Sequence, residues 1–313
     1  MRNLVLGANG RIGRLLQGIW PVLAPGLAAR TDWGMRPRAA DGAGTGAVSG
    51  AVRGDHAPCG GRTVVADPLG DPAGLAGLME GAQTLLCLAG VVPGPAAENA
   101  VSDNIALGLA AVRAARGTGA RVVLVSSAAV YGHGAGRLEE DRPPAPVNAY
   151  GRSKAAMEQE AAALAARLNV PLTILRIGNI AGLDAILGGW RPGFRLDRFD
   201  TGRTPARSYI GPVSLARVLA DLCEGPGDLP PCLNVAAPDP AGGAVEMGAL
   251  LDAAGRDWTP QPAPGHAIAE VHFALDRLWA TGVTPIPGSA TPAALVAEWR
   301  AARALGLLGK ERS

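Results

Sequence analysis

Residues 3–13 read Asn-Leu-Val-Leu-Gly-Ala-Asn-Gly-Arg-Ile-Gly, and this stretch decides the class of fold. The apolar run at 3–6 predicts a short buried strand, and the apolar spacing of residues 11–19 predicts a helix. The turn between them has the pattern GxxGxxG, formed by Gly7, Gly10 and Gly13. Such a turn lets backbone N–H groups and a helix N-terminus face a pyrophosphate. The order of strand, glycine turn and helix therefore predicts a dinucleotide site, with a plain glycine turn as the alternative in a chain of 44 glycines.

Short apolar runs and helical stretches alternate through the first half of the chain. Strands are predicted at 27–29, 63–66, 84–89, 122–126 and 172–177, and helices at 72–79, 96–116 and 150–168. Further helices are predicted at 213–222, 247–254, 267–281 and 292–305, with a strand at 233–236. The alternation predicts an α/β fold, a Rossmann-type doubly wound parallel sheet with a smaller C-terminal substrate lobe. The sheet domain is expected to be residues 1–178, with 213–237 returning to it, and the lobe to be residues 179–212 and 238–313.

The composition of the 313-residue chain excludes several classes of protein. Hydrophobic residues are 48% of the chain, which excludes global disorder, and aromatic residues are only 4%, which argues against an all-β sandwich or barrel. The net charge is +2 with no run of like charge, so we expect no nucleic-acid partner. The four cysteines lie far apart without a Cys/His cluster, so we expect no metal site. The first apolar run is too short for a signal sequence or a membrane span, so we expect a cytoplasmic protein without a membrane partner.

Hydroxyl, phenol and ammonium side chains recur at positions typical of one kind of catalytic site. The strand predicted at 122–126 leads into Ser126 and Ser127, at the sheet edge where open α/β sheets bind ligands. Tyr150 and Lys154 follow at i and i+4, on one face of a predicted helix. A phenol has a pKa of about 10, so it becomes a useful base only when a nearby ammonium stabilises the phenolate. We predict that Ser127 holds a substrate oxygen, that Tyr150 exchanges a proton with this oxygen, and that Lys154 lowers the pKa of Tyr150. An exposed helix pair is the alternative interpretation.

The cofactor form depends on the residue that ends the second strand, because that residue contacts the adenosine ribose. Arg30 directly follows the predicted strand 27–29, and an arginine there accommodates a 2′-phosphate. NADP is therefore slightly favoured over NAD. Asp32 lies two residues further on, and its carboxylate would favour NAD if the strand ended there instead.

The GxxGxxG turn, the string Ser-Ser-Ala-Ala-Val-Tyr-Gly at 126–132 and the YxxxK pattern together resemble the extended short-chain dehydrogenases/reductases. This is the NAD-dependent epimerase/dehydratase family, which includes UDP-galactose 4-epimerase, and the resemblance runs through most of the chain. With Arg30, it implies a cofactor site made of Gly7, Asn9, Gly10, Arg11, Ile12, Gly13, Asp67, Pro68, Leu88, Ala89, Gly90, Asn104, Lys154 and Ile177. It also implies substrate contacts from Ser127, Asn179 and Arg207, of which the arginine would bind a phosphate.

The resemblance implies hydride transfer at a secondary alcohol or ketone of a small, carbohydrate-like molecule. Ala128 and Ala129 stand where the dehydratases carry an Asp-Glu pair, so 4,6-dehydration is not expected. Gly211 and Pro212 replace the His-Val of the family's I-H-V segment, and the insert 180–206 is short, which favours a substrate smaller than a nucleotide sugar. A nucleotide-sugar 4-epimerase with tightly bound NAD and a non-catalytic dinucleotide-sensing protein are the alternatives. Helices equivalent to 96–116 and 150–168 often form a dimer in this family, which makes a homodimer a candidate assembly.

Overall fold

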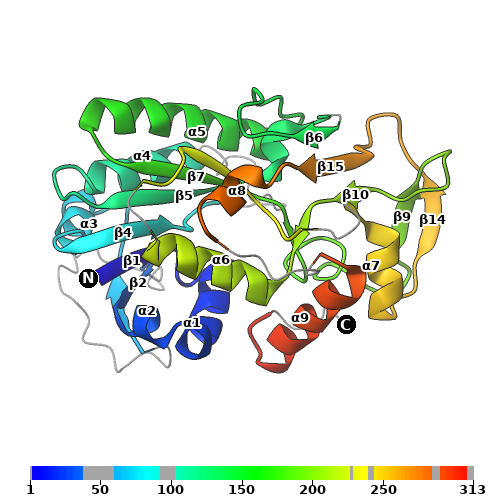
Figure 1. The fold of residues 1–313 in the computed structure, drawn as a ribbon, viewed down its shortest axis with the longest axis horizontal. Helices are drawn as coiled ribbons and strands as arrows, with labels where there is room; N and C mark the ends of the chain where they lie inside the picture. The colour runs from blue at the N-terminus through cyan, green and yellow to red at the C-terminus, as the bar shows by residue number, and fades with distance from the viewer. Residues whose placement is uncertain are drawn as a thin grey trace, which may run out of the picture. The chain divides into compact units, whose positions relative to one another are not determined.

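Seven strands form one parallel sheet in the part of the chain that the computed structural model describes, namely residues 2–37, 60–91, 103–134, 136–225, 228–238, 243–283 and 290–308 (Figure 1). Their spatial order is β12 (Cys232–Val235), β7 (Leu172–Ile177), β5 (Arg121–Ser127), β4 (Ala82–Cys87), β1 (Arg2–Leu6), β2 (Thr31–Met35) and β3 (Arg62–Val65). The chain runs outward from β1 through β2 to β3, and β4 then pairs with the opposite side of β1. The doubly wound α/β fold is confirmed. Its switch point lies between β1 and β4, and ligands bind beyond the carboxyl ends of the strands at such points.

The chain divides into two compact units, Met1–Val125 with Ala156–Ile174 and Ser126–Ala155 with Leu175–Ser313. The predicted sheet domain ran unbroken to residue 178 and took back residues 213–237. The observed division assigns the last residues of β5 and β7, and the first turns of α5 (Ala149–Leu168), to the second unit. Each unit therefore carries part of the predicted site. The glycine turn lies in the first unit, whereas Ser127, Tyr150 and Lys154 lie in the second.

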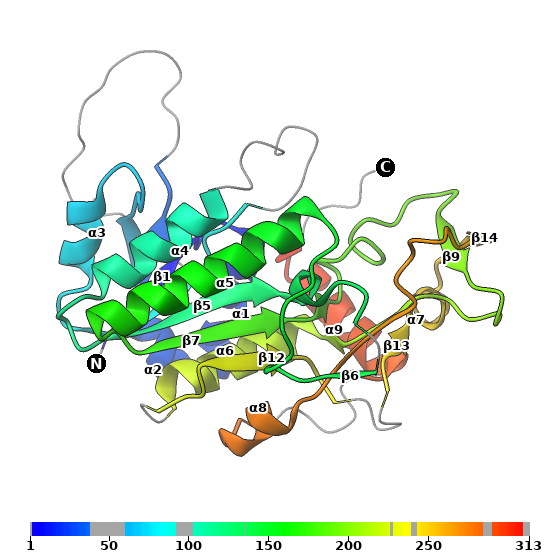
Figure 2. The ribbon, with the colours of Figure 1, turned by 90° about the horizontal axis from the view of Figure 1, so that it is seen from above.

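Helices cover both faces of the sheet strands in the first unit (Figure 2). They are α1 (Arg11–Leu23), α2 (Pro25–Ala29), α3 (Pro72–Leu78), α4 (Asp103–Ala114) and the larger part of α5. Leu85 and Leu124 of the sheet share one buried cluster with Met157 of α5. A Cβ on Gly108 of α4 would lie 2.7 Å from Cγ of Met157, so the missing side chain lets the two helices pack closely. The predicted helix 96–116 is thus observed as α4, and its residues 96–102 lie outside the described residues.

The second strand was predicted in the wrong place. Residues 27–29 lie in helix α2, because a short apolar run does not distinguish a strand from a buried helix and Pro25 starts a helical turn without losing a hydrogen bond. The strand is Thr31–Met35 instead. It accommodates the buried Asp32 because Arg2 and Arg62, on the strands to either side, pair with this carboxylate.

The second unit combines short strands with the C-terminal helices. The helices are α6 (Pro212–Glu224), α7 (Met247–Ala254), α8 (Asp276–Ala280) and α9 (Pro292–Ala304), with a 3₁₀ turn at Ala128–Tyr131. One sheet has the order β13 (Val245–Glu246), β10 (Ala206–Arg207), β15 (Glu270–Phe273) and β6 (Arg137–Leu138), and two pairs join β11 (Tyr209–Ile210) to β8 (Asn179–Ile180) and β14 (Thr259–Pro262) to β9 (Arg195–Arg198). The helix predicted at 267–281 is wrong in its first half, which is β15, where Val271 and Phe273 are buried in strand alternation. No helix lies between β8 and β10 in these described residues, so the insert is short as predicted.

Candidate active site

A cleft of about 250 Å³ opens at the switch point of the first unit. Residues that follow four neighbouring strands line it: Leu6, Gly7, Asn9, Gly10, Arg36, Ala66, Pro68, Leu88, Ala89, Gly90 and Leu107, the last from α4. Of the residues that the family resemblance assigns to the cofactor, the cleft brings together those of the glycine turn and of the segments after β3 and β4. Arg11, Ile12 and Gly13 belong to the first turn of α1, directly behind this lining.

The glycine turn is shaped to hold an anion against backbone. Gly7 has φ of +82°, and a Cβ on it would lie 2.8 Å from the amide nitrogen of Ala89. A Cβ on Gly13 would lie 2.5 Å from Cα of Ala8, so only glycine lets α1 pack this close to the turn. Gly10 is the N-cap of α1, and no side chain caps the N–H groups of the first helical turn. These uncapped donors and the positive end of the helix dipole fit a dinucleotide pyrophosphate.

Arg30 is not at the strand end that the sequence analysis assigned to it. It precedes β2, at the amino end of the strand, and its backbone carbonyl accepts a hydrogen bond from the amide of Asn3. Arg36 follows the carboxyl end of β2 and lines the cleft. Among the described residues, no hydrogen bond or ion pair engages the side chain of Arg36. Asp32 lies inside the strand and is occupied by two arginines, so it does not face the cleft edge either.

Two further predicted cofactor residues act on the backbone around the cleft. The side-chain amide of Asn104 accepts a hydrogen bond from the amide of Val91 at 2.9 Å and donates to its carbonyl at 3.1 Å. Asn104 thereby ties α4 to the segment that begins with Leu88-Ala89-Gly90. The Asp67 carboxylate accepts hydrogen bonds from the amides of Leu69 and Gly70, which closes the turn after Pro68. Direct contact of either residue with a cofactor stays a prediction.

The predicted catalytic residues lie on two packed segments of the second unit. Ser127 caps the 3₁₀ turn Ala128–Tyr131, because its Oγ accepts a hydrogen bond from the amide of Ala129 at 3.2 Å. Its hydroxyl proton therefore remains available for another acceptor. Tyr150 lies in the first turn of α5, and the next residue is Gly151, on which a Cβ would lie 2.4 Å from the carbonyl oxygen of Ala129. This glycine brings the start of α5 directly against the turn that Ser127 caps. Lys154 lies one helical turn further and is 4% exposed.

Tyr131 and Arg176 form the buried support beneath these segments. Arg176 donates hydrogen bonds to the Tyr131 hydroxyl and to the carbonyl of Glu140, both at 3.0 Å. The Tyr131 hydroxyl donates to Oδ1 of Asn234 at 2.8 Å. Burial raises the pKa of Tyr131 to about 12, against the opposing effect of the Arg176 charge. Tyr131 is therefore protonated at neutral pH, and its place is structural.

The predicted substrate residues Asn179 and Arg207 sit on short strands beyond β7. Asn179 opens β8 directly opposite Tyr209 of β11, and the side chains of these two residues are hydrogen-bonded. Arg207 donates to the carbonyls of Ala206 at 2.7 Å and Ile268 at 2.9 Å. No carboxylate of the described residues pairs with it, and burial lowers its pKa. Ile177, at the end of β7, is buried.

Comparison with known proteins places this geometry in a family. The family model named NAD dependent epimerase/dehydratase family matches residues 4–188, which is more than half of the chain. This chain belongs to the NAD-dependent epimerase/dehydratase family. Its members are enzymes, and the motifs quoted above fall at the positions that the family uses. No curated protein matches the sequence at a significant level.

Solved structures with the epimerase/dehydratase fold superpose on nearly the whole chain. The UDP-glucose 4-epimerase of Thermus thermophilus in complex with NAD has 22% identity and a TM-score of 0.66, covering 96% of this chain and 100% of that one. DesIV, a dTDP-glucose 4,6-dehydratase from Streptomyces venezuelae with NAD bound, has 20% identity and a TM-score of 0.67, covering 97% and 98%. A short-chain dehydrogenase/reductase superfamily protein from Agrobacterium tumefaciens with bound NAD has 18% identity and a TM-score of 0.71, covering 98% of both chains. At these identities the likeness establishes the fold.

Three features of this family member were not found from the sequence. Arg36 was noted only as a neighbour of Arg30, because the error in β2 hid its position. Tyr209 and Asp184 are joined by a hydrogen bond of 2.7 Å, which links residues 25 positions apart and leaves no local signal. The Glu298 carboxylate accepts two hydrogen bonds from Ser214 at the start of α6. It occupies the space beside Gly211, where the family motif has a histidine.

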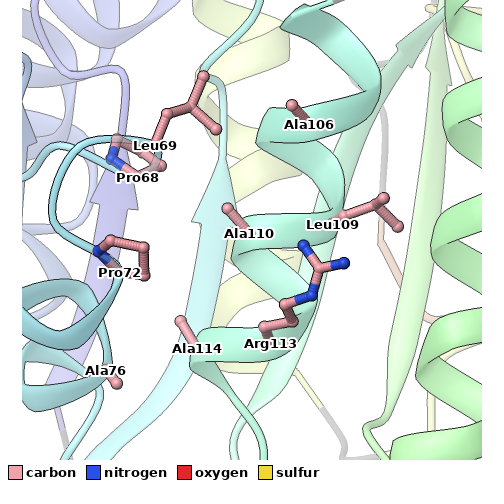
Figure 3. A pocket seen from close by; sticks show the side chains of 9 residues that line it. All are labelled: Pro68, Leu69, Pro72, Ala76, Ala106, Leu109, Ala110, Arg113 and Ala114. Carbon is pink, nitrogen blue, oxygen red and sulfur yellow. The ribbon is translucent and has the colours of Figure 1, made fainter.

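A second hollow of about 320 Å³ lies in the first unit between α3 and α4 (Figure 3). Its lining is apolar apart from one arginine: Pro68, Leu69, Pro72, Ala76, Ala106, Leu109, Ala110, Arg113 and Ala114. Pro68 also lines the cleft at the switch point, so the same turn separates the two hollows. No other predicted site residue reaches it. Within the described residues, no cluster of metal-binding side chains occurs and no helix is long and apolar enough to cross a membrane.

Proposed function

We propose that this enzyme is an NAD(P)-dependent oxidoreductase or epimerase that acts at a secondary alcohol or ketone of a carbohydrate-like substrate. The packing of the first turn of α5 against the turn capped by Ser127 carries this proposal. It holds the Tyr150 segment and the Ser127 segment in direct contact through the missing side chain of Gly151. A nicotinamide bound in the cleft would supply or accept the hydride, and the residues of the chain supply position and proton transfer.

The roles of the three catalytic side chains follow from their environments. The Ser127 hydroxyl, whose oxygen already accepts a backbone hydrogen bond, donates its proton to the substrate oxygen. The Tyr150 phenol exchanges a proton with the same oxygen as it changes between alcohol and ketone. Lys154 stabilises the phenolate, because an ammonium one helical turn away favours the charged form of the phenol. Ala128 and Ala129 provide no acid for expelling water, which supports redox or epimerase chemistry over dehydration.

We further propose NADP as the preferred cofactor, with Arg36 in the role that the sequence analysis gave to Arg30. Arg36 stands at the carboxyl end of β2, where the ribose-binding residue of a dinucleotide fold lies. Its guanidinium suits a 2′-phosphate, which it can bind through two parallel hydrogen bonds. Arg207 would bind an acidic group of the substrate, since it is buried without a carboxylate partner among the described residues. The alternative is a 4-epimerase that retains NAD; it is supported by the solved epimerase structures that contain NAD.

Substitution of Tyr150 tests the catalytic assignment. The wild-type protein would be screened with all four cofactor forms against simple sugars, sugar acids and nucleotide sugars. Tyr150→Phe removes one oxygen, so cofactor binding should persist while turnover falls about 100-fold or more. Ser127→Ala should also lower turnover, and Ser126→Ala is the matched control that should lower it clearly less. Near wild-type turnover in Tyr150→Phe would refute the assignment. Cofactor absorbance in the purified protein would instead favour the epimerase.

A further inference from the structure

The hydroxyl group of Tyr209 lies between two polar side chains of the second unit. It donates a hydrogen bond to Oδ2 of Asp184 at 2.7 Å and is also hydrogen-bonded to the side chain of Asn179. Tyr209 is completely buried, and its strand β11 pairs with β8 so that Tyr209 is level with Asn179. The three side chains therefore form a short chain of hydrogen bonds that ends at the residue assigned to the substrate.

The direction of each hydrogen bond is set by Asp184. Oδ1 of this carboxylate accepts hydrogen bonds from the amides of Gly182, Leu187 and Gly188, at 3.3, 3.1 and 3.3 Å. Oδ2 accepts the proton of Tyr209, so four donors surround the carboxylate. A carboxylate can only accept, and a phenol has one proton to donate. Once the Tyr209 proton is directed at Asp184, its oxygen can only accept from Asn179. The Asn179 amide must therefore turn Nδ2 toward Tyr209.

We propose that Asp184, acting through Tyr209, fixes the amide of Asn179 with its oxygen turned away from Tyr209, so that Asn179 accepts a hydrogen bond from a hydroxyl group of the substrate. Asp184 and Tyr209 are positioning residues, because they act through Asn179. The inference rests on the proposed function for the role of Asn179. It narrows the substrate class, since a hydroxylated carbon would be bound at this point and a phosphate oxygen, which only accepts, would be rejected.

The substitution Asp184→Asn should reverse this hydrogen-bond chain without emptying it. Oδ1 of the new amide keeps the three backbone donors, and its NH₂ group then faces Tyr209. The Tyr209 oxygen must accept this hydrogen bond, so its own proton turns to Asn179. Asn179 answers by rotating its amide half a turn, and its NH₂ group replaces its oxygen on the substrate side. Tyr209→Phe, in contrast, removes the hydroxyl and leaves the Asn179 amide without a fixed direction.

Neutron diffraction from deuterated crystals of the wild type and of Asp184→Asn tests the proposal without any substrate. We expect deuterium on Nδ2 of Asn179 facing Tyr209 in the wild type, and Oδ1 in that place in Asp184→Asn. A wild-type Asn179 oxygen facing Tyr209, or the same orientation in both proteins, would overturn the proposal. Because this readout needs neither turnover nor cofactor, it remains valid if the proposed function fails.

Kinetics provide the second readout, in the sugar and sugar-acid screen described above. Asp184→Asn should raise KM by about 10-fold or more with little change in kcat, since a substrate hydroxyl would meet a donor instead of an acceptor. Tyr209→Phe should raise KM less, although it removes more of the chain. A merely structural role predicts the opposite order, and that order would refute the proposal. Asp197→Asn is the matched control, because this carboxylate also accepts a side-chain amide, that of Gln261, in the same unit. Its KM should be unchanged.

Discussion

Arg30 and Arg36 stand at opposite ends of the same strand, and this difference decides which of them can meet a cofactor. We predict that Arg36→Ala weakens NADPH binding by about 1–3 kcal/mol, the usual effect of losing a charge-assisted hydrogen-bond partner. NADH should be affected much less, because it lacks the 2′-phosphate. Titration of each variant with both cofactors measures this. Arg30→Ala is the matched control and should change neither affinity. An equal loss of both cofactors in Arg36→Ala would contradict the NADP preference.

The three tyrosines show what single residues reveal before and after folding. The sequence separates Tyr150 from the others only by its lysine partner at i+4. In the structure, Tyr131 and Tyr209 are buried, and burial is the main cause of their raised pKa values. Both are thus held as neutral phenols within hydrogen-bond networks. Such networks join residues from distant parts of the chain, so no local pattern predicts them.

At the scale of elements, the strands with continuous apolar runs were predictable and the irregular ones were not. The segments at β1, β4, β5 and β7 have such runs because both faces of these strands are covered. β2 has the sequence Thr-Asp-Trp-Gly-Met, and its charge is tolerated only because arginines arrive from β1 and β3. This compensation is tertiary. The error then moved the ribose-binding position by six residues, from Arg36 to Arg30.

The N-terminus of α6 is stabilised by a residue from another helix. Its N-cap is Gly211, which has no side chain to offer, and Glu298 of α9 accepts hydrogen bonds from the amide and hydroxyl of Ser214 at 2.8 and 2.6 Å. We predict that Glu298→Ala lowers the free energy of unfolding by about 1–2 kcal/mol, as loss of a helix cap does. Urea denaturation measures this. Glu160→Ala, which removes an exposed carboxylate from α5, should have little effect.

A double-mutant cycle identifies the contact that causes this effect. A Cβ on Gly211 would lie 2.1 Å from Oε2 of Glu298, so Gly211→Ala should displace the carboxylate and destabilise the protein by itself. In the absence of Glu298 the added methyl group meets no carboxylate. The two substitutions should therefore be less damaging together than the sum of their separate effects. Strict additivity would show that Glu298 does not act at the start of α6.

For the whole molecule, binding and chemistry are assigned to different units, and ligand-linked stability separates them. The cleft is lined entirely by residues of the first unit, whereas Tyr150 belongs to the second. A ligand that binds only the folded state at 100 times its Kd stabilises it by about 2.7 kcal/mol. This corresponds to a rise in Tm of roughly 5–10 °C for a chain of this size. We therefore predict such a rise with NADPH in the wild type and an equal rise in Tyr150→Phe. Gly10→Val should fold, because φ of −74° suits any residue, but its side chain would block the pyrophosphate and abolish the rise. Calorimetry with and without NADPH measures all three proteins. A rise that survives in Gly10→Val would place the cofactor away from the glycine turn, and a rise that is lost in Tyr150→Phe would mean that the phenol holds the cofactor as well as moving a proton.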